Sequence, residues 1–424
     1  MKKVSVIGLG YVGLPLLCAI AKSGKYKAFG YDINADLVKS INKKICPIED
    51  DQCRRDIKEV DISVSDKTDV LKGSDIFIIC VPTPVSKNYV PNYGPVESAA
   101  KIASRYLKKG GTIILESTVN PGTCEEVVLP IIEKEAKLKV SKDFILAHCP
   151  ERINPGDDKW NVYNIPRNIG SLPEKSVKEV ADFYRSFLKA EVNEVSTLKI
   201  AEATKIVENT FRDINIAYVN ELAMSFDTLG IDLIETLKGA SNKPFAFMVH
   251  WPGRGVGGHC IAVDPYYLIN RAAKSGFTHS FLKIARDVNN NMPKYTVKRL
   301  QLALNEVRMP INGTKIALLG LSYKENVGDL RESPCLKIRT LLKNLGADLK
   351  IYDPYLPKLS NVKSPEDALK DTEAVLLCTA HDEFKVLDDI LSDYKTIKVV
   401  VDGMNKLDKD KIIKLGIVYR GIGR

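Results

Sequence analysis

Short apolar runs alternate with amphipathic stretches over the first 195 residues of this chain of 424 residues. Each apolar run has the length of a buried strand, and a segment of helical periodicity follows it. This alternation predicts a doubly wound α/β domain with a mainly parallel sheet. The expected strands are Val4–Gly8, Ala28–Asp32, Ile76–Val81, Thr112–Glu116 and Phe144–His148.

The segment from Ser196 to Gly230 contains no proline and no internal glycine. Its apolar positions recur at helical spacing, so we expect one long helix, on the order of 50 Å, between two domains. Lys205, Asn209 and Asp213 share one polar stripe of this helix. We expect the stripe to face a cleft between domains; the alternative is an ordinary solvated face.

A second strand–turn start appears at Lys315–Lys324, after a helical stretch near Lys283–Val307. This part of the chain lacks a GxGxxG turn, so we expect scattered side chains to hold its ligand. Three domains are therefore expected, over residues 1–195, 196–308 and 309–424. Further strands of the smaller sheet are expected at Asp348–Tyr352, Ala374–Leu377 and Val399–Asp402.

Gly8, Gly10 and Gly13 form the pattern GxGxxG between the first strand and the helical stretch Leu14–Lys22. In this context the pattern indicates a dinucleotide-binding turn, where a pyrophosphate lies at the helix N-terminus. Asp32 follows about 20 residues later, where a carboxylate binds ribose hydroxyls and repels a 2′-phosphate. We therefore expect NAD rather than NADP. The alternative for Asp32 is a solvated turn residue.

Cys260 ends a segment with glycines at positions 253, 255, 257 and 258. Most of the nine cysteines are expected to be inert buried residues. At Cys260, however, the glycines would leave backbone amides free to approach an anionic ligand. A thiolate near a nicotinamide cofactor can capture an aldehyde as a thiohemiacetal, which is then oxidised and hydrolysed to an acid.

Composition and charge narrow the class of protein. The cysteine count is odd and no CxxC pair occurs, so neither a disulfide framework nor a metal site is expected. The net charge of +9 is spread among acidic residues, which argues against nucleic-acid binding and suits an anionic substrate and cofactor. No apolar run approaches the roughly 18 residues needed to cross a membrane, so we expect a cytoplasmic protein.

Seven ordered motifs run along the chain, including GLGYVGLP at Gly8–Pro15, ESTVNPGT at Glu116–Thr123, CPERINPG at Cys149–Gly156 and GVGGHCIAVDPYYL at Gly255–Leu268. The others are VPTP at Val81–Pro84, EATKIVENTFRDINIAYVNE at Glu202–Glu221 and GLSYKENVGDLRESP at Gly320–Pro334. With these motifs the chain resembles the UDP-glucose/GDP-mannose dehydrogenase family over essentially its whole length. The resemblance implies two Rossmann-like domains joined by a long central helix and a helical dimerisation region. It also implies an NAD-dependent four-electron oxidation of a sugar C6 alcohol to a carboxylate.

The resemblance assigns roles to individual residues. Cys260 would be the nucleophile, Lys205 and Asn209 would hold the oxyanion at C6, and Asp264 would order a water molecule. Thr118 and Glu151 would position or deprotonate water. Residues implied to bind the cofactor are Gly8, Gly10, Tyr11, Val12, Gly13, Asp32, Val81, Pro82, Thr83, Ser117, Thr118 and Arg331, with 116–118 lining the nicotinamide side. Residues implied to bind the UDP-sugar are Glu151, Arg152, Ile153, Asn154, Lys205, Asn209, Arg212, Trp251, Gly253, Gly255, Gly257, Tyr323 and Lys324.

The motifs also bear on which sugar is bound. The sequences GGHC at Gly257–Cys260 and PERI at Pro150–Ile153 are similar to those of the N-acetylhexosamine branch. The segment 243–253 resembles UDP-N-acetylglucosamine 6-dehydrogenases, whereas 289–293 and 262–265 also fit UDP-N-acetylmannosamine enzymes. UDP-N-acetylglucosamine is favoured, with UDP-N-acetylmannosamine or another UDP-hexose as the alternative. An arginine that many relatives contribute across a dimer has no clear match; Lys243 or Arg254 are the candidates to replace it.

The long helix also suggests a quaternary structure. Its apolar residues lie on more than one face, which would leave a large exposed patch in a monomer, so we expect a homodimer or a larger assembly. These residues include Ile206, Val207, Ile216, Tyr218, Val219 and Phe226. Two other classes of function remain as alternatives, a reductase or epimerase without covalent catalysis and a non-catalytic sugar-nucleotide sensor.

Overall fold

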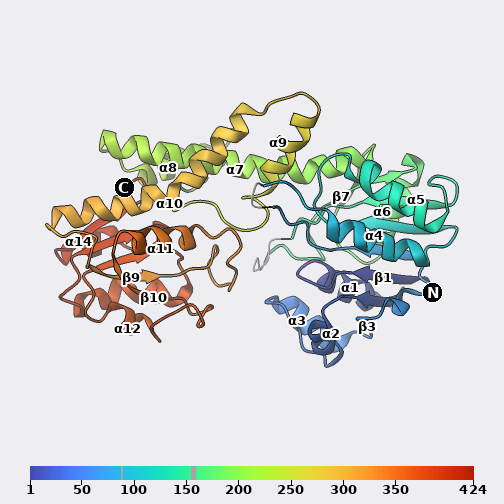
Figure 1. Cartoon of the computed structure of the whole chain (residues 1–424), viewed down its shortest axis with the longest axis horizontal. Coiled ribbons are helices and arrows are strands. Elements are labelled where there is room, and N and C mark those ends of the chain that lie inside the picture. The colour runs from blue at the N-terminus through green and yellow to red at the C-terminus, as the bar shows by residue number, and fades with distance from the viewer. Residues whose placement is uncertain (87–88, 154–158) are drawn as a thin grey trace. The chain divides into compact units, whose positions relative to one another are not determined.

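The computed structural model describes residues 1–86, 89–153 and 159–424, which form two compact units (Figure 1). The first unit comprises Met1–Glu208 and Tyr266–Phe277, and the second comprises Asn209–Pro265 and Thr278–Arg424. This partition into two units differs in kind from the expected division into three domains, which stays a prediction. Asn154, expected to bind substrate, lies outside the described residues.

The first unit is built on an eight-stranded sheet of order β3-β2-β1-β4-β5-β6-β7-β8. Neighbouring strands are parallel except β6 and β7, so the predicted doubly wound α/β architecture is confirmed. All five predicted strands are present. Sequence patterns missed β3, β7 and β8, because β3 and β8 have three residues each and β7 carries polar residues. The strands are β1 Lys3–Ile7, β2 Lys27–Tyr31, β3 Ser63–Ser65, β4 Ile76–Ile79, β5 Gly111–Leu115, β6 Phe144–His148, β7 Arg167–Leu172 and β8 Val192–Glu194.

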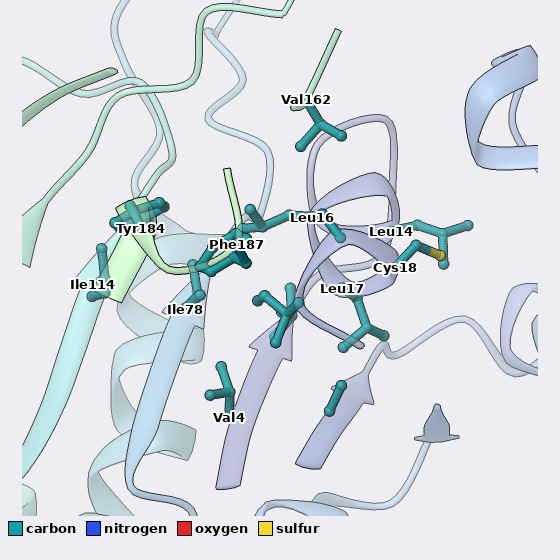
Figure 2. Close-up of a cluster of buried hydrophobic side chains, with 14 of the residues drawn as sticks. Val4, Leu14, Leu16, Leu17, Cys18, Ile78, Ile114, Val162, Tyr184 and Phe187 are labelled. Carbon is teal, nitrogen blue, oxygen red and sulfur yellow. The ribbon is translucent and has the colours of Figure 1, made fainter. Parts of the chain in front are cut away.

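Apolar side chains pack on both faces of this sheet. Successive residues of one strand point to opposite faces, so Ile78 belongs to one core and Phe77 to the other. Figure 2 shows the first core, in which Leu14 and Leu17 of helix α1 pack with Val4 of β1. The helices of this unit are α1 Gly13–Lys22, α2 Ala35–Asn42, α3 Asp51–Glu59, α4 Gly94–Tyr106, α5 Leu129–Ala136 and α6 Val177–Arg185.

The predicted long helix is confirmed as α7, Leu198–Leu229, slightly shorter than expected at both ends. Thr197 caps its start, because its hydroxyl oxygen accepts the backbone N–H of Ile200 at 3.2 Å. Gly230 ends it with a φ of +69°, and the N–H of Ile231 then bonds to the carbonyl of Phe226. Three further helices follow, α8 Leu233–Ala240, α9 Asp264–Lys274 and α10 Ser280–Glu306. No helix in the described ranges has the length and apolarity required to traverse a bilayer.

The second unit contains a five-stranded parallel sheet of order β10-β9-β11-β12-β13. Ile316 and Leu318 of β9 face a core with α10 and α11, while Ala317 and Leu319 face the opposite core. The smaller sheet is therefore also covered on both faces, as predicted. Its elements are β9 Lys315–Leu319, α11 Pro334–Asn344, β10 Asp348–Tyr352, α12 Pro365–Leu369, β11 Ala374–Leu377, α13 Leu387–Ile390, β12 Val399–Asp402, α14 Lys409–Lys414 and β13 Val418–Gly421.

Candidate active site

The glycine turn lies at the point where the strand order of the first sheet reverses, after β1 and beside β4. A Cβ on Gly13 would stand 1.9 Å from the carbonyl oxygen of Gly8, so only glycine lets the turn close. A Cβ on Gly10 would meet nothing within 4 Å. The turn is thus tight on one side and open on the other, which fits a diphosphate approaching the start of α1.

Asp32 is joined to this turn directly. Its Oδ2 accepts the backbone N–H of Leu9 at 2.8 Å, and its Oδ1 accepts that of Asn34 at 2.8 Å. The carboxylate therefore stands at the end of β2 beside the glycine turn, where a ribose would lie. This arrangement is more specific than the solvated turn residue considered as the alternative.

Segments expected on the nicotinamide side meet within the first unit. The Ser117 hydroxyl donates to the carbonyl of Val81 at 2.7 Å, and the Tyr267 hydroxyl donates to the carbonyl of Thr83. Thr118 is half-buried beside Ser117. The side chain of Glu116, in contrast, is fully buried. The expectation that Glu116 lines the cofactor is therefore wrong for its side chain, which turns into the core.

Glu116 and Glu151 share one buried arginine. Nη1 of Arg167 lies 3.2 Å from Oε2 of Glu116 and 3.1 Å from Oε2 of Glu151, and the Tyr184 hydroxyl donates to Glu116 Oε1 at 2.5 Å. Burial raises the pKa of Glu116 to about 7; the Arg167 charge opposes this rise and the Glu151 charge adds to it. Arg167, which is fully buried on β7, thereby holds the carboxylate of Glu151, an expected site residue, in place.

Local contacts fix the loop that carries Glu151. Its Oε1 accepts the backbone N–H of Arg152 at 2.5 Å and also that of Ile153. Arg152, expected to bind substrate, pairs with Glu208 of α7 at 2.6 Å. Lys205 lies one turn earlier on α7; it is 9% exposed and forms no hydrogen bond or ion pair with the residues described.

Asn209 and Asp264, expected to act beside Cys260, are in contact in the second unit. Nδ2 of Asn209 donates to Oδ2 of Asp264 at 2.5 Å, and both side chains are buried. The N–H of Asp264 donates to the carbonyl of Cys260 at 2.8 Å, so the cysteine's main chain leads directly into α9. Asp213, the third residue of the predicted stripe, instead pairs with Arg286 of α10 at 2.5 Å.

The glycine-rich segment before Cys260 packs against the turn after β9. A Cβ on Gly257 would stand 2.6 Å from Cβ of Tyr323, and one on Gly258 would stand 2.8 Å from its ring. The N–H of Gly258 donates to the carbonyl of Arg331 at 2.9 Å, and that of Gly253 donates to Asn220 Oδ1 at 2.9 Å. The expectation that these amides are free for a ligand is wrong for Gly253 and Gly258, whose N–H groups are bonded within the protein.

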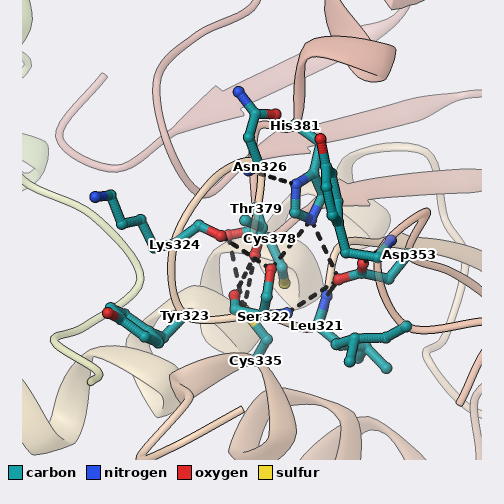
Figure 3. Close-up of polar contacts among 12 residues, drawn as sticks. Leu321, Ser322, Tyr323, Lys324, Asn326, Cys335, Asp353, Cys378, Thr379 and His381 are labelled. Atoms are coloured by element: carbon teal, nitrogen blue, oxygen red, sulfur yellow. Dashed lines mark hydrogen bonds and ion pairs between the residues drawn. The ribbon is translucent and has the colours of Figure 1, made fainter. Parts of the chain in front are cut away.

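The turn carrying Tyr323 and Lys324 is held by two buried residues, Asp353 and His381 (Figure 3). Oδ2 of Asp353 accepts the N–H groups of Leu321 and Ser322 at 2.7 and 3.0 Å. His381 accepts the N–H of Asn326 at Nδ1, so its proton lies on Nε2, which is 3.2 Å from Asp353 Oδ2. Asp353 thus binds the turn much as Asp32 binds the glycine turn of the first sheet.

The remaining expected residues of the second unit differ in exposure. Arg331 forms an ion pair with Asp329 of its own turn. Arg212 and Trp251 are exposed. Arg254 is only 3% exposed and its guanidinium bonds within its own unit, so it cannot replace an arginine contributed across a dimer. That possibility is wrong for Arg254 and remains for the exposed Lys243.

Sequence reasoning missed several residues that position the site. They include Arg167, Tyr184, Asp353 and His381, and no local pattern marks the first two or His381. The positioning role of Asn289 was also missed; it donates to Asp213 and accepts from Asn220 at 2.8 Å in each case. Asp353 had one detectable signal, because an acidic residue ending the second strand of a doubly wound sheet matches the position of Asp32.

The chain matches one family along its length. Models of the NAD binding, central and UDP binding domains of the UDP-glucose/GDP-mannose dehydrogenase family match residues 2–188, 199–291 and 317–409. The UDP-N-acetyl-D-mannosamine dehydrogenase of Pyrococcus horikoshii is 36% identical, covering 100% of this chain and 99% of the relative. The UDP-N-acetyl-D-glucosamine 6-dehydrogenase of Pseudomonas aeruginosa is 37% identical, covering 96% and 98%.

A solved structure agrees with these matches. The UDP-D-ManNAc dehydrogenase structure from Pyrococcus horikoshii superposes with a TM-score of 0.93 at 35% identity, covering 100% of this chain and 99% of that chain. The glycine turn at the switch point of the first sheet and the buried turn of the second sheet occur where the NAD binding and UDP binding models match. The chain belongs to the UDP-glucose/GDP-mannose dehydrogenase family.

Proposed function

We propose that this protein oxidises the C6 alcohol of a UDP-N-acetylhexosamine to the uronic acid through a covalent intermediate on Cys260. Oxidation of the alcohol with one water molecule and two NAD⁺ yields the carboxylate, two NADH and three protons. The observation that carries the proposal is the hydrogen bond between Asn209 and Asp264. Asp264 is the first residue of α9, and its backbone N–H donates to the carbonyl of Cys260. NAD, when bound, accepts hydride in each of the two oxidations.

In this proposal Cys260 forms and later breaks a carbon–sulfur bond. Its thiolate adds to the C6 aldehyde to give a thiohemiacetal, which becomes a thioester when hydride leaves. Water then attacks the thioester carbon, and the thiolate is the leaving group that regenerates the enzyme. The location of Cys260 between Gly258, which donates to the carbonyl of Arg331, and the helix start supports this role, because its main chain is fixed on both sides.

Lys205 and Asn209 would stabilise the oxyanion at C6. They stand one turn apart on α7, and both side chains are buried, with 9% and 6% exposure. A cationic donor and an amide donor stabilise negative charge most strongly where water is excluded. The contact with Asp264 supports the assignment for Asn209, because it orients the amide nitrogen.

Glu151 and Thr118 would handle the water molecules. Glu151 is held by Arg167 and by two backbone N–H groups, so its carboxylate has a fixed position. A carboxylate that positions or deprotonates water needs such fixed geometry. Arg331, Tyr323 and Lys324 would contact the cofactor or the UDP-sugar, as the resemblance implies.

The assembly would be a homodimer in which α7 takes part. Val207, Phe211 and Tyr218 are spaced along one side of α7 and are 60%, 45% and 56% exposed. Ile206 and Val219, also expected at the interface, are buried within the chain instead. The exposed stripe supports pairing of two copies about a two-fold axis.

The sugar is proposed to be N-acetylglucosamine, with N-acetylmannosamine or another hexose as the alternative. Sequence identity does not distinguish the two N-acetylhexosamines. The chain is 36% identical to a UDP-N-acetyl-D-mannosamine dehydrogenase and 37% identical to a UDP-N-acetyl-D-glucosamine 6-dehydrogenase. The decisive experiment incubates the enzyme with NAD and, separately, with UDP-N-acetylglucosamine, UDP-N-acetylmannosamine and UDP-glucose. We expect about two NADH per sugar oxidised, with the highest kcat/KM for UDP-N-acetylglucosamine. One NADH per sugar would favour a non-covalent reductase, and no turnover with bound UDP-sugar would favour a sensor.

A further inference from the structure

The guanidinium of Arg254 bonds to groups at the switch point of the second sheet, the position where parallel α/β sheets usually bind a ligand. In the second sheet β9 lies between β10 and β11, so the strand order reverses between β9 and β11. Nη2 of Arg254 donates to the carbonyl of Tyr323 at 2.9 Å, after β9, and to the Thr379 hydroxyl at 3.3 Å, after β11. The guanidinium therefore bridges the segments that follow β9 and β11, the two strands on either side of the switch point.

The partners of this guanidinium come from separate segments of the second unit. Besides Tyr323 and Thr379, it reaches the carbonyl of Ser322 at 3.4 Å and Sδ of Met404, which follows β12. Its main-chain N–H donates to the carbonyl of Gly403 at 3.1 Å. One side chain thus ties the segment that leads to Cys260 to the ends of three strands.

Sulfur, rather than a carboxylate, faces the positive charge. Nε of Arg254 donates to Sγ of Cys335 at 3.0 Å, and within the described part of the chain the guanidinium donates to carbonyls, a hydroxyl and two sulfurs but to no carboxylate. Burial opposes ionisation of Cys335, yet its contact with Cys378 and the charge of Arg254 together hold the pKa of its thiol well below the usual value. The Cys335 sulfur is therefore a polarisable acceptor for the Arg254 guanidinium.

We propose that Arg254 is a positioning residue that fixes the Cys260 segment and the Tyr323–Lys324 turn as one rigid surface. The proposal rests on the proposed function, in which the turn holds the UDP portion of the substrate and Cys260 meets the sugar. Arg254 belongs to the Cys260 segment and its guanidinium donates to the carbonyl of Tyr323, while Gly257 and Gly258 pack directly on Tyr323. The distance between nucleotide and nucleophile is then set by Arg254 rather than by the substrate.

The test compares Arg254→Met and Arg254→Lys with the unchanged enzyme and with Arg420→Met as a matched control. Arg420 lies on β13 in the same unit and pairs with Glu306 of α10. Each protein is assayed for the Kd of UDP by calorimetry, the rate of Cys260 alkylation by iodoacetamide, the Kd of NADH by fluorescence, and kcat and KM.

For Arg254→Met we expect UDP binding to weaken about tenfold and the Cys260 alkylation rate to change at least about threefold, with kcat falling about tenfold or more. The lysine variant should be intermediate, because it keeps the charge but cannot bridge two carbonyls and a sulfur. NADH affinity should stay unchanged in all variants. Arg420→Met should match the unchanged enzyme in every measurement.

Cys335→Ser provides a second test that does not depend on the folding of the Arg254 variants. It replaces the sulfur that accepts from Nε of Arg254 while leaving Arg254 in place, so we expect smaller changes in the same direction. The proposal would be overturned if a folded Arg254→Met protein kept its UDP affinity, its Cys260 alkylation rate and its kcat within twofold of the unchanged enzyme. If that protein does not fold, the same result for Cys335→Ser would overturn it. Failure of the unchanged enzyme to oxidise any UDP-sugar would instead refute the proposed function, while UDP binding and alkylation would still test Arg254.

Discussion

Nδ2 of Asn209 donates a 2.5 Å hydrogen bond to Oδ2 of Asp264, which joins the middle of α7 to the first residue of α9. A carboxylate oxygen can only accept a hydrogen bond. The group of Asn209 that faces Asp264 is therefore its NH₂ and not its carbonyl oxygen. One of the two amide protons points at Asp264, and in the proposed mechanism the second would donate to the oxyanion.

Replacing Asn209 should therefore impair chemistry more than binding. For Asn209→Ala we expect kcat to fall on the order of 100-fold, with a much smaller change in KM, because the lost donor acts on charge that develops in the transition state. Asp264→Asn keeps an oxygen acceptor and should lose less. Steady-state kinetics with the preferred UDP-sugar measure both values, and an unchanged kcat in Asn209→Ala would remove the residue from the oxyanion site.

The covalent step predicts a specific effect at Cys260. Cys260→Ser should lose net formation of the uronic acid by several orders of magnitude and keep the affinity for UDP-sugar, since a hydroxyl is a poorer nucleophile than a thiolate. Product is measured by chromatography and binding by calorimetry. Cys149→Ser, at a buried cysteine of the first unit, is the matched comparison for NADH formation. A serine variant of Cys260 with normal turnover would favour the reductase alternative.

Cofactor choice should depend on Asp32. A 2′-phosphate would meet its carboxylate, and we expect NAD to be preferred over NADP by at least about tenfold, or roughly 1.4 kcal/mol. Asp32→Asn keeps an oxygen acceptor for Leu9 and removes the charge, so it should narrow that ratio. The ratio of kcat/KM for the two cofactors is the measurement. Equal efficiency in the unchanged enzyme would contradict the assignment.

The buried Glu116 should make stability depend on pH. Its pKa is raised from 4.5 to about 7 on folding, so its contribution to stability is present below pH 4.5 and is lost as pH rises through 7. Glu116→Gln is neutral at every pH. The unfolding free energy of the unchanged protein minus that of the variant should fall by on the order of 2 kcal/mol from pH 5 to pH 8. Urea unfolding tests this, and a constant difference would show that Glu116 stays ionised.

The exposed stripe of α7 should control assembly. Introducing charge with the double change Phe211→Glu and Tyr218→Glu should shift the protein to monomers and abolish activity, because an apolar interface cannot bury two unpaired carboxylates. Light scattering at micromolar concentration gives the mass. Lys414→Glu, an exposed change on α14, should leave mass and activity unchanged. An unchanged protein that is active as a monomer would contradict the proposed homodimer.

The sequence by itself determined the features whose cause is local. Apolar runs fixed the strands that are buried on both faces, such as β4 and β11, because each run must hide all its side chains. The absence of proline and glycine determined α7, and the spacing of Gly8, Gly10 and Gly13 determined the tight turn before α1. These outcomes depend on neighbours within a few residues, so they can be read along the chain.

Only the tertiary structure decided which distant groups neutralise and position one another. Arg167 lies 51 residues from Glu116, and Arg254 lies 81 residues from Cys335, yet each pair is buried and in contact. A buried charge must find a partner wherever packing places one, and no local spacing encodes that choice. For the same reason the glycines near Cys260 looked like a ligand cradle in sequence, whereas folding used them to bring the main chain against Tyr323.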